Sequence, residues 1–236
     1  MTSKSTIHVA NLGNTSALAN VQHATALDLH GDQVFLVLRI FDITPSMDGH
    51  IDELIKAADE NIKALKDSAA ANEFLISTWL FNSADGFIVL DGFVPIEDVT
   101  PLDHKICKTA GITNLFDTVY TGLTDKNAGI LPYAKKLSLS GITPKVAVAV
   151  FTDGGDNDSR IDPQQIKNEI SLAEGYFFTL FAFGTGFGPK AATAMGFPNC
   201  AEHDAVHGNI RKLMGTFSKS LVRASQTTVA SNQFIA

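Results

Sequence analysis

Apolar side chains occur along this chain in short continuous runs, which alternate with segments of helical spacing. Five runs rich in branched and aromatic residues predict strands, because near-continuous apolar character is typical of strands covered on both faces. These runs are 34–41, 74–81, 87–93, 145–151 and 176–183. The segment NSADG between the second and third runs is short enough for a hairpin, so one antiparallel strand is expected at the sheet edge.

Helices are predicted between these strands. In residues 51–65 the apolar positions recur every three or four residues and therefore share one helix face. Asn114 is placed to cap a second helix, and prolines at helix-start positions open two more. The predicted helices cover 51–65, 115–123, 132–139, 163–175 and 204–225.

Strands that alternate with helices, together with one hairpin, predict an α/β fold: a doubly wound, mostly parallel sheet flanked by helices, with one antiparallel edge strand. With 236 residues, 45% of them hydrophobic, the chain suits one globular domain with a substantial core. We expect this domain to cover 33–225. The more polar residues 1–32 are an N-terminal arm or an added strand, and 226–236 form a C-terminal tail.

The charge balance limits the choice of partners. Lys and Arg number 18 against 25 Asp and Glu, a net charge of -7, so the chain has no basic field to attract nucleic acid or an anionic membrane surface. The N-terminal residues 1–20 contain no apolar run of signal-peptide length, and no later run is long enough for a membrane span. The two cysteines suggest neither a disulfide framework nor a zinc site, which favours a reducing, cytoplasmic location.

Three polar segments rich in oxygen donors lie where ligands bind in such a sheet, beyond the carboxyl ends of parallel strands. DITPS follows the strand 34–41, GITNLFD precedes the helix that starts at 115, and TDGG follows the strand 145–151. Carboxylates and hydroxyls without Cys or His favour magnesium, with manganese or calcium as alternatives. The candidate ligands are Asp42, Thr44, Ser46, Thr113 and Asp153.

The spacing in the first segment has a physical reason. Alternate residues of an extended segment point the same way, so Asp42, Thr44 and Ser46 can face one point. Neutral hydroxyls in direct contact with a cation leave its charge only partly compensated. Such a site attracts an incoming carboxylate more strongly than a site already crowded with acids.

These segments resemble, in sequence and in order, those of von Willebrand factor A domains that carry a metal-ion-dependent adhesion site. Asp42, Thr44 and Ser46 match the Asp-x-Ser-x-Ser segment of that family. Thr113 matches the threonine of a Gly-x-Thr-x-Leu-x-Asp-like segment, and Asp153 matches the aspartate of a Thr-Asp-Gly turn. The family usually has serine where this chain has Thr44, which keeps the hydroxyl but adds a methyl group.

The resemblance covers roughly residues 33–225 and implies a Rossmann-like fold and a binding rather than a catalytic role. It implies that Thr44 and Ser46 ligate the metal directly and that Thr113 does so directly or through water. It also implies that Asp42 and Asp153 act through water or by orienting the ligands.

The resemblance further implies a protein partner whose exposed Asp or Glu completes the coordination of the metal. In bacteria, members of this family often work beside AAA-type ATPases or in stress-response and resistance clusters. We therefore expect a partner of that kind, such as an AAA-type ATPase or a component of a resistance complex, with no nucleic acid and no membrane.

Two other functions stay open at this point. The first is a metal-dependent phosphatase or phosphotransferase with Asp42 as nucleophile, although haloacid-dehalogenase-like phosphatases carry a second aspartate where this chain has Thr44. The second is a structural assembly subunit with a vestigial site. Asp156 and Asp158 either hold a second cation or serve as solvated helix-start carboxylates, and a helix-start or supporting role is expected for Asp117.

Overall fold

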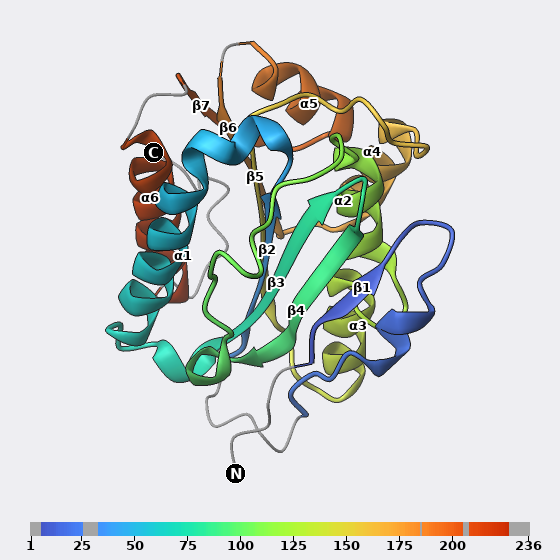
Figure 1. Ribbon diagram of the computed structural model, residues 1–236. Coiled ribbons are helices and arrows are strands. Elements are labelled where there is room, and N and C mark those ends of the chain that lie inside the picture. The colour runs from blue at the N-terminus through green and yellow to red at the C-terminus, as the bar shows by residue number, and fades with distance from the viewer. Residues whose placement is uncertain (1–5, 26–32, 185, 205–207, 227–236) are drawn as a thin grey trace.

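A seven-stranded sheet runs through the middle of the molecule (Figure 1). The computed structural model describes residues 6–25, 33–184, 186–204 and 208–226. The strand order is β1-β4-β3-β2-β5-β6-β7. The strands are β1 His8–Ala10, β2 Phe35–Asp42, β3 Phe74–Asn82, β4 Gly86–Pro95, β5 Lys145–Thr152, β6 Phe177–Phe183 and β7 Asn199–His203.

Five strands of the sheet, β2, β3, β5, β6 and β7, run parallel to one another. The predicted hairpin is present, because β4 pairs antiparallel with β3, but β4 is not the edge strand that was predicted, since β1 lies outside it. The short strand β1 pairs antiparallel with the outer side of β4, so part of the polar N-terminal segment extends the sheet. The predicted fold class, a doubly wound and mostly parallel sheet, is confirmed, while the domain boundaries at 32/33 and 225/226 stay predictions.

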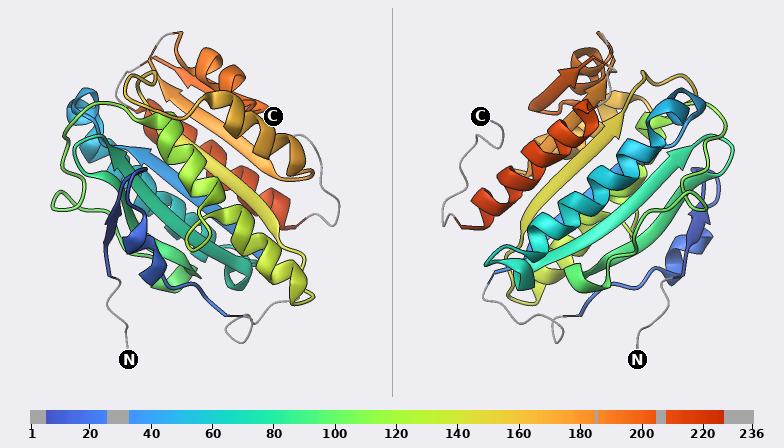
Figure 2. Two further views of the ribbon diagram at one scale, coloured as in Figure 1. Left: turned by 90° about the vertical axis from the view of Figure 1, so that its right-hand side faces the viewer. Right: turned by 60° about the vertical axis from the view of Figure 1, so that its left-hand side comes forward.

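Helices cover both faces of the sheet (Figure 2). One face packs against α1 and α6, and the other against α2, α3, α4 and α5. No helix within the described part of the chain is long and apolar enough to cross a membrane. The helices are α1 Ile51–Lys66, α2 Leu115–Thr124, α3 Ile130–Leu139, α4 Pro163–Leu172, α5 Gly188–Met195 and α6 Asn209–Ser225, with the 3-10 helices η1 Ser16–Asn20, η3 Pro45–His50, η4 Ala71–Glu73 and η5 Ile96–Asp98.

The two-sided cover explains the continuous apolar runs in the sequence. Successive side chains of a strand point to opposite faces, so a central strand needs apolar residues at every position. In β2, Phe35, Val37 and Phe41 belong to the core beneath α1 and α6, while Leu36 and Leu38 belong to the core on the other side.

Three differences from the prediction lie near the C-terminus. The helix α5 and the strand β7 were not predicted, because α5 is short and the β7 sequence NCAEH is mostly polar. The helix α6 begins at Asn209 rather than 204, after Gly208, whose φ of 97° is incompatible with a right-handed helix. Residues 205–207 of the predicted helix lie outside the described residues. Nearer the middle of the chain, α3 begins at Ile130, two residues before the predicted start.

Candidate metal centre

The three oxygen-rich segments meet at the carboxyl edge of the sheet, the upper edge in Figure 1. Asp42 is the last residue of β2, and Thr152 is the last residue of β5. The two strands are parallel neighbours, with Phe41 paired to Phe151, so Asp42 and Thr152 end them side by side. The predicted placement of these loops at one point of the sheet edge therefore follows from the register of β2 and β5.

Asp42 is fully buried, and both of its carboxylate oxygens accept hydrogen bonds. Its Oδ1 accepts from the backbone N–H of Thr44 at 2.9 Å, and its Oδ2 accepts from the hydroxyl of Thr152 at 2.6 Å. Burial of the charged form raises the pKa of Asp42 to about 6. The carboxylate thus has a fixed orientation, and a nearby cation would favour its charged form.

Hydroxyl oxygens connect Asp42's loop to Asp153. The hydroxyls of Thr44 and Ser46 lie 3.1 Å apart, and the Ser46 hydroxyl donates to Oδ1 of Asp153 at 2.8 Å. Thr44 is buried and Ser46 is exposed, so the oxygens run from the protein interior to the surface. Burial raises the pKa of Asp153 as well. The first and third predicted segments are therefore joined by hydrogen bonds between side chains.

The backbone around Thr113 is held from two sides. Gly111 has a φ of 66°, and a Cβ atom there would lie 2.5 Å from the backbone nitrogen of Ala84, so only glycine fits. Ile112 exchanges two hydrogen bonds with Ser83: the Ile112 N–H donates to the Ser83 hydroxyl at 2.8 Å, and the Ile112 carbonyl accepts from the Ser83 N–H at 2.9 Å. These contacts fix the turn that leads into Thr113.

On its other side, Thr113 is bonded to the loop after Asp153. Its N–H donates to Oδ1 of Asn157 at 2.8 Å, and its carbonyl accepts from the backbone N–H groups of Asn157 and Asp158, both at 3.0 Å. The Thr113 hydroxyl faces Gly154, since a Cβ atom built at Gly154 would lie 3.8 Å from it. In the described part of the chain this hydroxyl has no hydrogen-bond partner, although Thr113 is only 4% exposed.

These donors fit a hard divalent cation. Two carboxylates and three hydroxyls come from three neighbouring loops, and no described residue competes for the Thr113 hydroxyl. Within the described ranges there is no group of three or more His, Cys, Asp or Glu side chains that could hold a metal ion, so a cation at this edge would depend on hydroxyl oxygens as well as on the two carboxylates. Hydrogen bonds join Asp42, Thr44, Ser46 and Asp153, and the Thr113 hydroxyl faces Gly154, the residue next to Asp153. The role of these five residues as ligands stays a prediction.

The acidic loop after Asp153 caps helix α2. The Phe116 N–H donates to Oδ1 of Asp156 at 3.3 Å, and the Asp117 N–H donates to the Ser159 hydroxyl at 3.0 Å. Asn114 occupies the N-cap position of α2, but its side chain makes no capping hydrogen bond. The loop thus supplies the cap that was predicted for Asn114.

Asp117, in the first turn of α2, also binds the loop that follows Asp153. Its Oδ1 accepts from the backbone N–H groups of Arg160 and Ile161, both at 2.8 Å. Asp162 caps the next helix, since its side chain accepts from the N–H of Gln164 at 2.9 Å. Helix-start roles therefore account for Asp117 and Asp162, and the contacts of Asp156 with α2 account for that residue in the same way.

Three residues that support the site were missed in the sequence. Thr152 fixes Asp42, Asn157 fixes Thr113, and Ser83 fixes Ile112. A signal existed for Thr152, because a threonine that ends a strand beside the strand of Asp42 is placed to bond its carboxylate. No local pattern marks Ser83 or Asn157, since their partners lie 29 and 44 positions away.

The geometry of Asp42 does not suit nucleophilic attack. A nucleophile needs an oxygen that a substrate can approach, as well as free lone pairs on that oxygen. Asp42 is 0% exposed, and both of its oxygens are engaged by Thr44 and Thr152. The arrangement suits the orientation of neighbouring groups better than covalent catalysis.

The chain is similar to several solved structures, although no protein-family model matches its sequence and no curated protein matches it. Proximal thread matrix protein 1 from the mussel byssus, with a zinc-occupied MIDAS motif, superposes with a TM-score of 0.52 at 15% identity, over 82% of this chain and 46% of that protein. The ArnB paralog VWA2 from Sulfolobus acidocaldarius superposes with a TM-score of 0.51 at 13% identity, over 80% of this chain and 45% of that protein.

A third similar structure is the pilus adhesin SpaC from Lactobacillus rhamnosus GG, with a TM-score of 0.58 at 9% identity, over 86% of this chain and 32% of that protein. The chain thus spans less than half the length of each of these proteins. The chain has the fold of von Willebrand factor A domains.

Proposed function

We propose that this chain is a metal-dependent protein-binding module, which captures an acidic side chain of a partner at the carboxyl edge of its sheet. In this proposal the cation is magnesium, and five side chains hold it. One observation carries the proposal: the Thr113 hydroxyl, which has no hydrogen-bond partner among the described residues, faces Gly154, the residue after Asp153 in the hydrogen-bonded set of oxygens. The five residues are Asp42, Thr44, Ser46, Thr113 and Asp153.

Each residue of the site has a separate task in this proposal. Both carboxylate oxygens of Asp42 accept hydrogen bonds, from Thr44 and Thr152, so Asp42 orients the first loop. Its negative charge attracts the cation without direct contact. The Ser46 hydroxyl donates its hydrogen bond to Asp153, so the lone pairs of the Ser46 oxygen are available to a cation. When bound, the cation supplies a positive charge that attracts a carboxylate from outside.

The charge count supports capture of an acid rather than a base. The proposed direct donors Thr44, Ser46 and Thr113 are neutral, and Asp42 and Asp153 act through water or by orienting these donors, so the groups in direct contact with a divalent cation do not compensate its charge. A cation with neutral donors keeps a strong attraction for an anionic group at its open side. From the family resemblance, the proposed partner is a cytoplasmic protein, such as an AAA-type ATPase or a component of a stress-resistance complex.

The test uses manganese as the cation and acetate as the simplest carboxylate. Water-proton relaxation reports both the binding of Mn²⁺ and the loss of its coordinated water when a carboxylate binds. We expect the wild-type protein to bind Mn²⁺ and acetate to lower the relaxation enhancement. Ser46→Ala and Asp153→Asn each weaken Mn²⁺ binding at least about tenfold, as expected when a metal ligand or its supporting group is lost.

Asp158→Asn is the matched control, because Asp158 is an exposed acid in the same loop as Asp153. We expect it to bind Mn²⁺ as the wild type does. Equal Mn²⁺ binding by the wild type, Ser46→Ala and Asp153→Asn would contradict the proposed site. Tight Mn²⁺ binding with no response to acetate would contradict carboxylate capture and would favour a vestigial site in a structural subunit.

A further inference from the structure

A cavity of about 430 Å³ lies between α1 and the segment 99–102, on the face of the sheet that α1 covers. Its volume falls within the range of small-molecule sites in proteins. Arg39 of β2 forms part of the cavity wall, next to apolar side chains from α1 and from the segment 99–102. These apolar residues are Ala58, Ile62, Val99, Pro101 and Leu102. The cavity thus combines apolar walls with a buried cationic group.

The Arg39 guanidinium is buried without the partners that a buried charge needs. Arg39 is 1% exposed, and the described residues offer it two neutral acceptors, Asn61 and Thr78. A guanidinium has five N–H groups. The buried Nε of Arg39 has no hydrogen-bond partner in the described part of the chain. Since buried charges in proteins are usually paired with an opposite charge, an anion inside the cavity would supply the missing partner.

The charged end of Arg39, rather than its stem, reaches the cavity. The strand β2 lies inside the sheet between β3 and β5, and the Arg39 side chain extends toward α1, where it bonds to Asn61. Burial lowers the pKa of Arg39 to about 10, and the charges of Asp91 and Asp59 act in the opposite direction. Asp59 also belongs to the cavity wall, so the guanidinium lies within electrostatic reach of the cavity and is charged at neutral pH.

The wall opposite α1 is held by a second buried charge. Asp91 is 2% exposed, and its Oδ1 accepts from the N–H of Thr100 at 3.1 Å and from the Thr100 hydroxyl at 2.7 Å. These bonds fix the segment 99–102 against the sheet. Asp91 thus anchors the cavity wall and acts on the charge of Arg39 from a distance.

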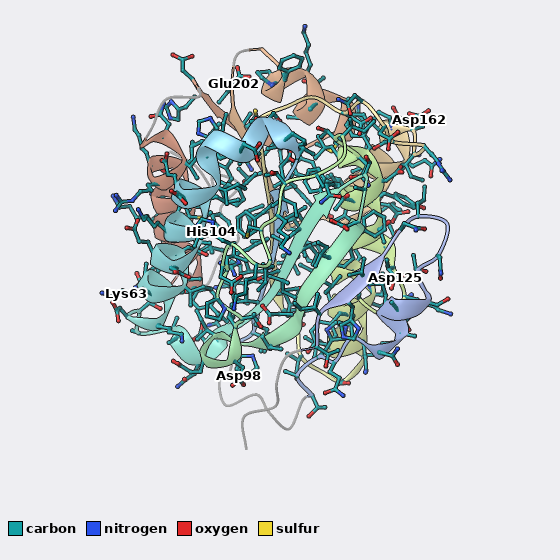
Figure 3. The ribbon with its side chains drawn as sticks, viewed as in Figure 1. Lys63, Asp98, His104, Asp125, Asp162 and Glu202 are labelled. Atoms are coloured by element: carbon teal, nitrogen blue, oxygen red, sulfur yellow. The ribbon has the colours of Figure 1, made fainter. Side chains whose placement is uncertain are left out.

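The exposed part of the cavity wall carries charges of both signs. Lys63, which Figure 3 shows on α1, is exposed, as are Asp59 and Asp67. Lys66 is half-buried and forms an ion pair with Glu97 at 3.1 Å. The two exposed acids disfavour a multiply charged anion, whereas the guanidinium favours a single negative charge and the apolar walls favour an apolar body.

We propose that this cavity binds a small monocarboxylate with an apolar body, whose carboxylate pairs with the Arg39 guanidinium while its body contacts the apolar walls. Two parallel N–H groups of a guanidinium match the two oxygens of a carboxylate. The pairing removes the cost of an unpaired buried charge, so the carboxylate decides the affinity. This site is separate from the metal centre, because Arg39 precedes Asp42 by three residues in β2 and its cavity lies beneath α1.

The test uses 4-fluorobenzoate as the carboxylate and 4-fluorobenzamide as its uncharged analogue, with binding followed by ¹⁹F NMR. The protein is freed of divalent cations, so that no carboxylate binds through a metal at the carboxyl edge. We expect 4-fluorobenzoate to bind at least about tenfold more tightly than 4-fluorobenzamide. Arg39→Met lowers the affinity for 4-fluorobenzoate at least about tenfold and leaves that for 4-fluorobenzamide unchanged.

Two substitutions at exposed positions keep the test decisive even if Arg39→Met does not fold. Asp59→Asn removes an acid near the guanidinium and should raise the affinity for 4-fluorobenzoate about two- to threefold. Lys63→Glu should lower this affinity about threefold or more. Lys56→Glu is the matched control, because it makes the same charge change at an exposed position of α1 outside the cavity wall, and it should leave the affinity unchanged.

Each contrary outcome overturns the inference. Equal binding of the two fluorinated compounds, or undiminished binding of 4-fluorobenzoate by Arg39→Met, shows that the guanidinium does not hold the carboxylate. Equal effects of Lys63→Glu and Lys56→Glu place the binding outside the cavity. Displacement of the probe by inorganic phosphate as readily as by unlabelled benzoate rules out selection of an apolar monocarboxylate. No binding of 4-fluorobenzoate at millimolar concentration overturns the inference as well, and in every case the proposed metal centre stands.

Discussion

Asp42 is a fully buried carboxylate that accepts hydrogen bonds only from neutral donors within the described chain, the N–H of Thr44 and the hydroxyl of Thr152. An ionised group in such surroundings lowers the stability of the fold, because its hydration is lost without a compensating charge. The raised pKa of Asp42, about 6, has this cause. A divalent cation at the site supplies the charge that the protein itself does not.

Asp42→Asn should separate stability from metal binding. In the metal-free protein at pH 7.5 we expect the variant to exceed the wild type in unfolding free energy by up to about 3 kcal/mol, from a shift of about two pKa units. The amide keeps the bond from Thr44 and donates to Thr152, whose hydroxyl then turns to the carbonyl of Gly154, 3.1 Å away. Stabilisation by Mg²⁺ is lost in the variant.

The sign of the pH dependence follows from the direction of the shift. The folded-state pKa of Asp42 lies above the unfolded value of 3.8, so the contribution of this residue is fully present below about pH 4 and is lost as the pH rises through 6. In urea unfolding without metal, the two proteins should have equal unfolding free energies near pH 4, and Asp42→Asn should have the higher unfolding free energy at pH 7.5. A wild type more stable than the variant at pH 7.5 would contradict this expectation.

At the scale of elements, the site depends on the connection between α2 and the loop 156–161. Asp117 in the first turn of α2 holds the N–H groups of Arg160 and Ile161, and Asp156 and Ser159 in return cap α2. This reciprocal bonding keeps the loops of Thr113 and Asp153 in contact.

Asp117→Ala removes two hydrogen bonds to a charged group that is only 5% exposed. We expect the unfolding free energy to fall by about 2 to 3 kcal/mol and Mn²⁺ affinity to fall with it, since the loop that carries Asp153 loses its anchor. Asp158→Ala in the same loop should change stability by less than about 0.5 kcal/mol. Equal effects of the two substitutions on urea unfolding would contradict the anchoring role of Asp117.

A second connection joins the sheet to the helices on its other face. Arg39 of β2 is 1% exposed, and its Nη1 donates to Oδ1 of Asn61 in α1 at 3.1 Å, while its Nη2 donates to the hydroxyl of Thr78 at 2.7 Å. Asn61 in turn donates to the hydroxyl of Ser218 in α6 at 2.8 Å. Burial lowers the pKa of Arg39 to about 10, which reflects the energetic cost of this buried charge.

Asn61→Leu keeps the branched shape of the side chain but removes one of the two acceptors, Asn61 and Thr78, that the described residues provide for the Arg39 guanidinium. We expect a loss of about 3 kcal/mol in unfolding free energy and unchanged Mn²⁺ affinity. The double variant Arg39→Met/Asn61→Leu should regain part of the loss, because the buried charge is then absent. A double variant less stable than Asn61→Leu alone would show that Arg39 stabilises the core by other means.

The elements differ in how far the sequence predicts them. Strands such as β2 and β5 were predicted because a strand covered on both faces needs an apolar residue at every position. The polar edge strand β7 has no such requirement and gives no such signal. The three oxygen-rich loops were predicted because they adjoin β2, β5 and α2. Ser83 and Asn157 were missed because their partners are distant in the sequence and are brought near them only by folding.

At the scale of the whole molecule, the fold separates the core from the site. The two helical layers bury the sheet faces, and the loops at the carboxyl edge are left to present polar groups, as in other doubly wound sheets (Figure 2). The chain carries a net charge of -7, which repels an acidic partner. A divalent cation at this edge offsets the negative charges of Asp42 and Asp153, and its open side gives an acidic segment a place to bind.

The central claim is that oxygens from three loops surround one divalent cation. Anomalous diffraction from crystals grown with Mn²⁺ tests it most directly. We predict one strong anomalous peak at the carboxyl edge of β2 and β5, at coordination distance, about 2.2 Å, from the hydroxyls of Thr44, Ser46 and Thr113. The absence of an anomalous peak among these hydroxyls would contradict the claim. Manganese bound elsewhere, with the three hydroxyls too far apart to share one cation, would contradict it as well.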